Sequence, residues 1–257
     1  MSTCSTASFL ELGRDVIREE QKAVSQLIPR LDHRFEQACQ LILKTQGRVV
    51  VIGMGKSGHI GKKIAATLAS TGTPAFFVHP SEASHGDLGM ITAQDTVIAI
   101  SNSGETGEII QLLPLFTRLS VNSIALCGMP SSTLARYATV TLDTSVSKEA
   151  CPLGLAPTSS TTCTLVMGDA LAISLLHARG FDHEDFARFH PGGSLGQRLL
   201  VRTRDLMHCS DAIPSVAETA TLHEALIEMT DKRLGMTTIA QDDGKLKGIF
   251  TDGDLRR

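Results

Sequence analysis

The spacing of hydrophobic residues changes near residue 47. Before that point, from about Thr6 to Gln46, the apolar positions at helical spacing include Phe9, Val16, Val24, Leu27, Leu31, Phe35, Leu41 and Ile42. Most of them are three, four, seven or eight residues apart, as on one face of a helix. Pro29 interrupts the pattern, because proline lacks the amide hydrogen that a helix interior uses. The segment therefore predicts two helices.

From Arg48 onward, short apolar runs alternate with stretches of helical pattern. Five strands are predicted at "RVVVIG", "AFFVH", "DTVIAIS", "NSIALC" and "VTLD". The helices are expected over Ser57–Ser70 with Gly72 as its stop, from Glu105, over Ser131–Ala138, and over Ser159–Arg179 with Gly180 as its stop. This alternation predicts an α/β fold with a doubly wound, five-stranded parallel sheet, most simply in flavodoxin-like strand order.

Flavodoxin-like order brings the ends of the first and third strands together at the topological switch point, where ligands bind. The loops that leave these strands are "GMGKSG" and "SNSGET". We expect them to face one crevice, around Lys56, Ser57, Ser101, Ser103 and Thr106.

The first of these loops contains Gly-x-Gly-x-x-Gly, which is common in dinucleotide-binding domains. Such domains also need an acidic residue at the end of the second strand to bind the ribose, but that strand ends in "FFVHP" and Glu82 comes later, inside the loop. A P-loop is excluded too, because Val50 stands where its first glycine belongs. Neither nucleotide-binding motif fits.

The "SNSGET" loop has the chemistry of a site for one phosphate group. Ser101 and Ser103 supply hydroxyl donors, and Gly104 lets the backbone approach a ligand closely. Thr106 is predicted in the first turn of a helix, whose free amide groups attract anions. A serine-rich helix cap would have the same residues, and the facing Lys56 loop favours the phosphate site.

Composition narrows the function classes. The chain has 257 residues and a net charge of −3, which provides no broad basic surface for nucleic acid or an anionic membrane. It shows no leader-like segment and no run of about eighteen apolar residues, so we expect a cytoplasmic protein with no membrane partner. The six cysteines form no C-x-x-C pair or zinc-site spacing.

Four stretches, in the expected order between Gly55 and Gly196, resemble the sugar isomerase (SIS) domain of the D-arabinose 5-phosphate isomerase family. They are "GKSGHIGKKIAATLASTGTPAFFVHPSEASHGDLGMI", "SNSGET", "KEACPLGLAPTSSTTCTLVMGDALA" and "HPGGSLG". Near the C-terminus, "GIFTDGDLRR" resembles the end of a cystathionine-β-synthase (CBS) motif, which follows the isomerase domain in this family.

The resemblance implies an aldose–ketose isomerase that interconverts D-ribulose 5-phosphate and D-arabinose 5-phosphate through an enediol. Its product would feed synthesis of 3-deoxy-D-manno-octulosonate for lipopolysaccharide or capsule. No redox or organic cofactor is required. Lys56, Glu108, Glu149 and His190 match the family's catalytically relevant positions. A carboxylate should abstract the proton, and the sequence leaves Glu108 and Glu149 open as candidates, with burial of Glu149 expected to raise its pKa.

The resemblance also implies a set of substrate-binding residues, namely Ser57, Gly72, Thr73, His85, Ser101, Asn102, Ser103 and Thr106. Zinc is expected as an inhibitor, with His79 as its ligand. Family members assemble, so we expect a homotetramer in which His190 completes a neighbouring subunit's site.

Two other functions stay open at this point. SIS domains also serve as non-catalytic sensors of sugar phosphates, although such regulators carry a DNA-binding helical domain and no basic recognition helix is evident here. An isomerase of another phosphosugar, such as a hexose phosphate, would use the same residue types.

The C-terminal stretch predicts a strand, a helix from Thr221, two strands around an Asp-Gly turn at 243–244, and the first turn of another helix. A CBS motif works in pairs, and only one incomplete copy is present, so we expect truncation. The predicted divisions are residues 1–46 as helices that pack on the isomerase domain, 47–200 as the SIS domain, and 205–257 as an incomplete α+β CBS segment.

Overall fold

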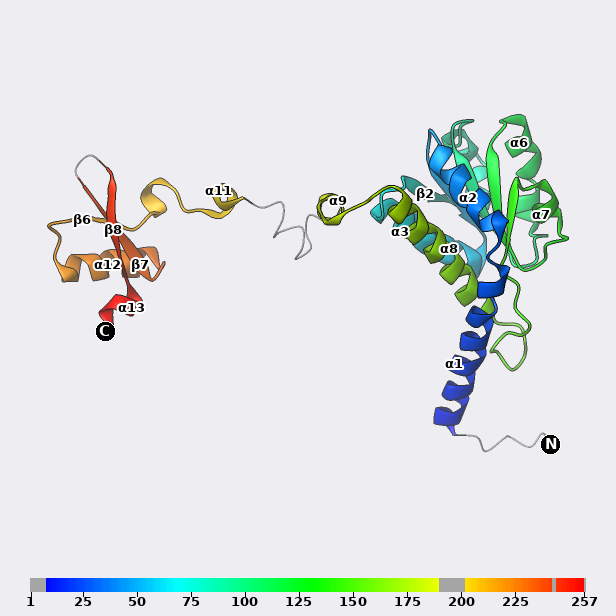
Figure 1. The fold of residues 1–257 in the computed structure, drawn as a ribbon, viewed down its shortest axis with the longest axis horizontal. Coiled ribbons are helices and arrows are strands. Elements are labelled where there is room, and N and C mark those ends of the chain that lie inside the picture. The colour runs from blue at the N-terminus through cyan, green and yellow to red at the C-terminus, as the bar shows by residue number, and fades with distance from the viewer. Residues whose placement is uncertain (1–7, 190–201, 242–243, 257) are drawn as a thin grey trace. The chain divides into compact units, whose positions relative to one another are not determined.

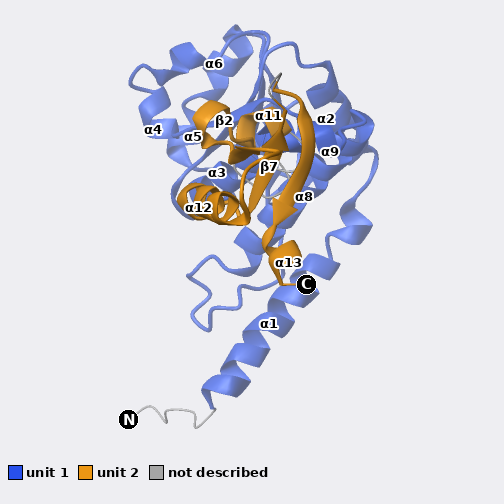
Figure 2. Ribbon diagram, turned by 90° about the vertical axis from the view of Figure 1, so that its left-hand side faces the viewer, with its two compact units in different colours: residues 1–196 blue, residues 197–257 orange. Residues whose placement is uncertain are grey.

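The computed structural model describes residues 8–189, 202–241 and 244–256. The chain forms two compact units, Met1–Gly196 and Gln197–Arg257, coloured separately in Figure 2. The first unit contains the five-stranded sheet, and the second contains a sheet of three strands.

The sheet of the first unit has the order β2-β1-β3-β4-β5, with every described pairing parallel. Its strands are β1 (Val49–Gly53), β2 (Ala75–Val78), β3 (Thr96–Ile100), β4 (Asn122–Cys127) and β5 (Val140–Asp143). This is the predicted fold class and the predicted strand order. β1 and β3 are buried along their whole length, as expected for central strands covered on both faces. The switch point therefore lies between the ends of β1 and β3.

Helices cover both faces of this sheet (Figure 1). One face carries α1 (Phe9–Ser25), α2 (His33–Lys44), α3 (Gly55–Ser70) and α8 (Ser159–Ala178). The other carries α4 (Pro80–Ala83), the 3-10 helix η2 (Asp87–Met90), α5 (Gly107–Ile110), α6 (Leu113–Arg118) and α7 (Thr133–Tyr137). After α8 comes α9 (His183–Phe189).

The predicted pair of N-terminal helices is confirmed. Ser8 and Glu11 form a capping box at the start of α1, which satisfies amide groups that a helix end leaves free. Pro29 lies in the short 3-10 helix η1 (Ile28–Arg30) between α1 and α2. α1 protrudes from the body of its unit in Figures 1 and 2, and the side chain of Phe9 is 94% exposed.

α3 and α8 lie side by side and run in the same direction. Residues later in α3 contact residues later in α8. Lys63 forms an ion pair with Asp169. Further along both helices, Thr73, just after α3, accepts a hydrogen bond of 3.2 Å from Arg179, just after α8. Gly168 permits the close approach, because a Cβ there would lie 2.5 Å from the side chain of Ile64. The first turns of both helices therefore lie at the carboxyl edge of the sheet, where the strands end.

α8 is long and apolar enough to cross a membrane by length and composition. Its contacts account for the apolar sequence, because Cys163, Met167 and Leu171 are buried in the core that the sheet and the covering helices share. α8 is thus a core helix of the first unit.

One predicted helix differs from the helices in the structure. The expected single helix from Glu105 is divided into α5 and α6, because Pro114 at the start of α6 cannot donate an amide hydrogen bond to the preceding turn. Thr106 precedes α5 as its N-cap residue instead of lying in its first turn. Glu108 therefore belongs to a helix of only four residues.

The second unit has the predicted order of elements. β6 (Ser215–Ala217) is followed by α12 (Leu222–Lys232), β7 (Met236–Ala240), β8 (Leu246–Thr251) and α13 (Asp252–Leu255). Thr221 is the N-cap residue of α12 and forms a capping box with Glu224. β7 pairs with β6 in parallel and with β8 in antiparallel fashion. Two short helical segments, α11 (Thr203–Leu206) and η3 (Ser210–Ala212), precede this sheet.

Candidate functional site

The carboxyl edge of the five-stranded sheet brings most of the predicted site residues together. Lys56 follows β1, His85 follows β2, Glu108 follows β3 and Glu149 follows β5. Parallel strands end at one edge, so loops that are distant in sequence meet there. The contact between Ser81 Oγ and Met54 Sδ, 3.9 Å apart, joins the chain after β2 to the chain after β1.

The turn after β1 places Lys56 and Ser57 in the first turn of α3, which begins earlier in the chain than the sequence pattern predicts. The turn is tight, because a Cβ at Gly58 would lie 2.6 Å from the carbonyl oxygen of Gly53. Met54, the N-cap residue, makes no side-chain cap, so the first amide groups of α3 are free of a capping side chain. The Lys56 side chain is exposed, and its charge is available to an anion at this edge.

The loop from Ser101 to Thr106, which we call the phosphate loop, is ordered by its own hydroxyl groups. Ser101 is only 2% exposed, and its Oγ accepts a hydrogen bond of 3.0 Å from the Gly104 amide. The same Oγ lies 2.7 Å from Thr106 Oγ1. Ser101 therefore orients Thr106 and has little surface for a ligand, whereas the sequence pattern predicts a direct contact.

Other groups of the phosphate loop face solvent. Asn102 and Ser103 are exposed, and Thr106 is half-buried. Ser103 Oγ accepts a hydrogen bond of 3.2 Å from the Glu105 amide, which leaves the hydroxyl proton of Ser103 free to donate. Ser103 and Thr106 are thus the hydroxyl groups of this loop that can reach an anion.

The two candidate bases occupy different environments. Glu108 is exposed in α5. Glu149 is half-buried, and its Oε2 accepts hydrogen bonds from the amides of Thr158 (2.8 Å) and Ser160 (3.2 Å) at the start of α8. The Thr158 hydroxyl adds a third, at 3.0 Å.

These contacts set the charge of Glu149. Burial acts to raise the pKa of this carboxyl, but the hydrogen bonds from Ser160 and Thr158 outweigh burial and hold the pKa below its ordinary value. The expectation of a raised pKa is wrong, because the helix N-terminus supplies donors that the sequence pattern does not reveal. Glu149 is therefore ionised at neutral pH and caps α8.

The N-terminal helices hold the segment that carries Glu149. Arg30 donates a hydrogen bond to the carbonyl oxygen of Ser145, two residues after β5. Lys148 Nζ lies 3.7 Å from a carboxylate oxygen of Glu19 in α1. α1 and η1 thus support the Glu149 segment as well as the sheet.

Two predicted residues lie apart from this edge. Gly72 and Thr73 follow α3 at the amino edge of the sheet, just before β2. Thr73 is buried, and Gly72 has a positive φ of 87° and lies against Phe181. Another predicted site residue, His190, lies outside the described residues.

The predicted zinc ligand, His79, is the N-cap residue of α4 and is half-buried, and His85 is exposed. Among the residues that the structure describes, no three His, Cys, Asp or Glu side chains are grouped to hold a metal ion. Inhibition by zinc stays a prediction.

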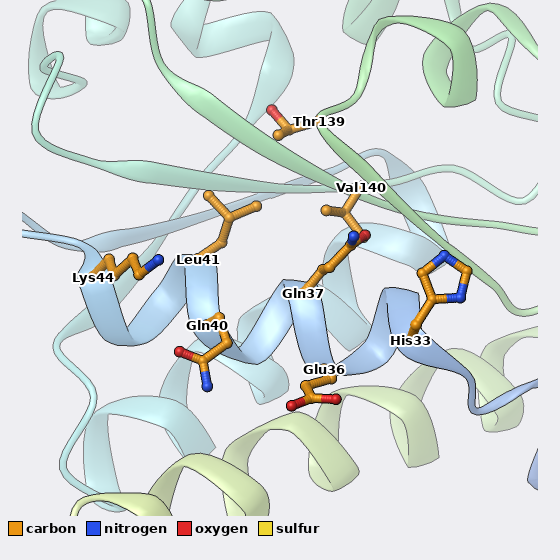
Figure 3. Close-up of a pocket in the computed structure, with 8 residues that line it drawn as sticks. All are labelled: His33, Glu36, Gln37, Gln40, Leu41, Lys44, Thr139 and Val140. Atoms are coloured by element: carbon orange, nitrogen blue, oxygen red, sulfur yellow. The ribbon is translucent and has the colours of Figure 1, made fainter.

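A cavity of about 530 Å³ lies elsewhere in the first unit, between α2 and the start of β5 (Figure 3). His33, Glu36 and Lys44 are among its lining residues, and none of the predicted site residues lines it. Its position beside the amino end of β5 separates it from the loops described above.

Comparisons with known proteins agree with this geometry. The SIS domain family matches residues 42–174, and the CBS domain family matches residues 204–257. The chain is 59% identical over 257 residues to arabinose 5-phosphate isomerase KdsD of Pseudomonas aeruginosa, covering all of this chain and 79% of that protein. It is also 59% identical over 249 residues to the protein of that name in Escherichia coli K12, covering 97% and 76%.

A solved structure gives the corresponding match in three dimensions. A protein of Escherichia coli CFT073 in complex with arabinose 5-phosphate superposes with a TM-score of 0.70 and is 42% identical, covering 73% of this chain and 100% of that one. The matched fraction agrees with the size of the first unit.

Proposed function

Since this chain belongs to the arabinose 5-phosphate isomerase family, we propose that the carboxyl edge of its first unit is the site where D-ribulose 5-phosphate and D-arabinose 5-phosphate are interconverted. The protein is an aldose–ketose isomerase with an SIS domain and a CBS domain. The observation that carries the site assignment is the convergence of a cation, a phosphate-type loop and two carboxylates on one edge of the sheet. We place the enzyme in the cytoplasm, supplying 3-deoxy-D-manno-octulosonate synthesis.

The phosphate loop and the first turn of α3 bind different parts of the substrate. Ser103 and Thr106 donate hydroxyl hydrogen bonds to the substrate phosphate, and Ser101 holds Thr106 in position. Lys56 lies across the switch point and stabilises the negative charge that develops on the sugar oxygens. No redox or organic cofactor enters this chemistry, since a proton is moved and no electron is transferred to an acceptor.

We assign proton abstraction to Glu108. In the direction of the aldose, a base removes a proton from C1 of ribulose 5-phosphate, the C2 oxygen gains a proton to give the enediol, and C2 is then protonated while the C1 hydroxyl becomes the aldehyde. Glu149 Oε2 is already saturated by three donors, and the lowered pKa makes Glu149 a weaker base. Glu149 instead holds its segment against α8.

We further propose that the site is completed by a neighbouring subunit of a homotetramer. Gly72 and Thr73 lie at the amino edge, about 24 Å from Lys56 at the 1.5 Å rise of the intervening helix α3. One pentose phosphate cannot contact both ends of α3 within one subunit. If a second copy presents its amino edge and its His190 to this carboxyl edge, one pentose phosphate can contact both sets of residues.

The test is turnover in deuterium oxide. Ribulose 5-phosphate is incubated with the protein, and arabinose 5-phosphate carrying deuterium at C2 is expected, because the proton added to C2 of the enediol exchanges with solvent. Fructose 6-phosphate and unphosphorylated ribulose serve as comparison substrates, and both should turn over far more slowly. Binding of the pentose phosphate without conversion would identify a sensor, and preference for the hexose phosphate would identify a different isomerase.

A further inference from the structure

The phosphate loop is held against the loop that follows β4 and against the start of α7. The Gly128 amide donates to the Asn102 carbonyl at 2.9 Å, and the Leu134 amide donates to the Gly104 carbonyl at 3.1 Å. Gly104 has a positive φ of 66°, and a Cβ there would lie 2.0 Å from Ser132 Oγ. These backbone contacts fix the first half of the phosphate loop, up to Gly104.

A side chain continues this attachment into the second half. Glu105 Oε1 accepts a hydrogen bond of 2.6 Å from the amide of Thr133, the first residue of α7. Amides at a helix start have no acceptor within the helix, so the carboxylate satisfies a donor that would otherwise face solvent. That bond, a second hydrogen bond from the Thr133 side chain and the nearby charge of Arg136 hold the pKa of Glu105 below its ordinary value.

The negative charge of Glu105 makes the direction of its side chain important in a loop that binds phosphate. A carboxylate in a loop that binds phosphate would repel its ligand if it faced the same way. Here the carboxylate faces the start of α7, where the helix dipole favours a negative charge. The adjacent backbone amide of Glu105 meanwhile donates to Ser103 Oγ, and the next residue is Thr106.

We infer that Glu105 is a positioning residue that fastens the second half of the phosphate loop to α7, so that Ser103 and Thr106 are already directed at the substrate phosphate before it binds. This inference rests on the proposed function, which assigns the phosphate to these two hydroxyls. Losing the bond to Thr133 lets the loop relax, and binding then has to restore its order. The effect should fall on KM, because the reacting carbons lie away from the phosphate.

Thr133 offers a matched pair of variants for the partner group. Thr133→Pro removes the donating amide, and proline is well tolerated at the first position of a helix. Ser132, the preceding residue, has an extended backbone with φ −67° and ψ 167°, which suits a following proline. Thr133→Ala keeps the amide and removes only the hydroxyl, which accepts a bond from Arg136 and also interacts with the Glu105 carboxylate.

The experiment measures kcat, KM for arabinose 5-phosphate and competitive inhibition by inorganic phosphate in the full chain. Glu105→Ala and Thr133→Pro should each raise KM about fivefold and weaken phosphate inhibition to a similar degree, the size expected for the loss of one hydrogen bond at an exposed side chain. kcat should stay within about twofold. Glu105→Gln, which keeps an oxygen acceptor, should stay close to the unmodified protein. Thr133→Ala, which removes the hydroxyl and keeps the amide, should raise KM less than Thr133→Pro does. The double variant Glu105→Ala/Thr133→Pro should be no worse than either single one, because both remove the same bond.

Two results would overturn the inference: an unchanged KM in Glu105→Ala, or effects of the two variants that multiply in the double variant. Ser103→Ala and Thr106→Val, measured in the same series, separate this from the proposed function. If those two raise KM and Glu105→Ala does not, only the positioning role fails. If those two also leave KM unchanged, the phosphate is bound elsewhere and the site assignment fails.

Discussion

The two units of this chain bury their strands to very different degrees. In the first unit, β1 and β3 are buried along their whole length between two layers of helices. In the second, β8 is exposed or half-buried throughout, with Leu246 and Ile249 at 65% and 56% exposure. Central strands covered on both faces give rigid ends on which catalytic loops can be fixed. This difference accords with our proposal that the first unit carries the chemistry, since the proposed site residues all belong to it.

A large effect is expected at Lys56. Lys56→Ala should lower kcat about a hundredfold, because removing one cation that stabilises an oxyanion costs on the order of 3 kcal/mol of transition-state free energy. The fold should persist, since the side chain is exposed. Lys63→Ala, on the same helix and paired with Asp169, is the matched control and should retain near-normal turnover. Equal turnover in both variants would remove Lys56 from the mechanism.

The next prediction tests whether each active site is formed by one subunit or by two. His190→Ala and Glu108→Ala chains should each be inactive, and an equal mixture should recover about a quarter of the unmodified activity if each site takes these residues from two subunits. The measurement is turnover after the two chains are co-expressed and shown to form mixed oligomers. Mixed oligomers without activity would mean that each subunit supplies its own histidine.

A smaller effect distinguishes Glu149 from Glu108 by what each contributes to the free energy of unfolding. Glu149→Gln should lower the free energy of unfolding by about 1 kcal/mol at neutral pH, because the carboxylate caps α8, whereas Glu108→Gln should leave it nearly unchanged. The folded-state pKa of Glu149 is lowered, so its contribution is present above the ordinary pKa and is lost as pH falls through the folded value.

Denaturant unfolding at several pH values between neutral and acidic tests this assignment. The gap between the unmodified protein and Glu149→Gln should narrow below the ordinary carboxyl pKa of 4.5. A gap that is constant with pH would show that the charge of Glu149 does not stabilise the fold.

The sequence predicted the sheet of the first unit, including its strand order, because buried runs such as Val49–Gly53 and Thr96–Ile100 are typical of strands in a parallel sheet covered on both faces. It also placed Lys56, Glu108 and the phosphate loop at one edge. It missed the break between α5 and α6, although Pro114 is a visible signal for it.

Other features could not be predicted from the sequence, because they depend on contacts between distant segments. The lowered pKa of Glu149 results from amides nine and eleven residues later in the chain. The burial of Ser101 and the bond from Thr133 to Glu105 arise only when the loops after β3 and β4 come together. A serine that binds a ligand and a serine that orders a loop have the same sequence signature.

The smallest expected effect tests the central claim, that the first unit contains everything the reaction needs. A chain ending at Arg204 lacks the sheet of the second unit and should keep kcat/KM for arabinose 5-phosphate within about twofold of the full chain, because no proposed site residue is removed. Its thermal unfolding midpoint should also stay close to that of the first unit in the full chain. A collapse of both turnover and melting temperature would contradict the account and show that the CBS unit is integral to the isomerase.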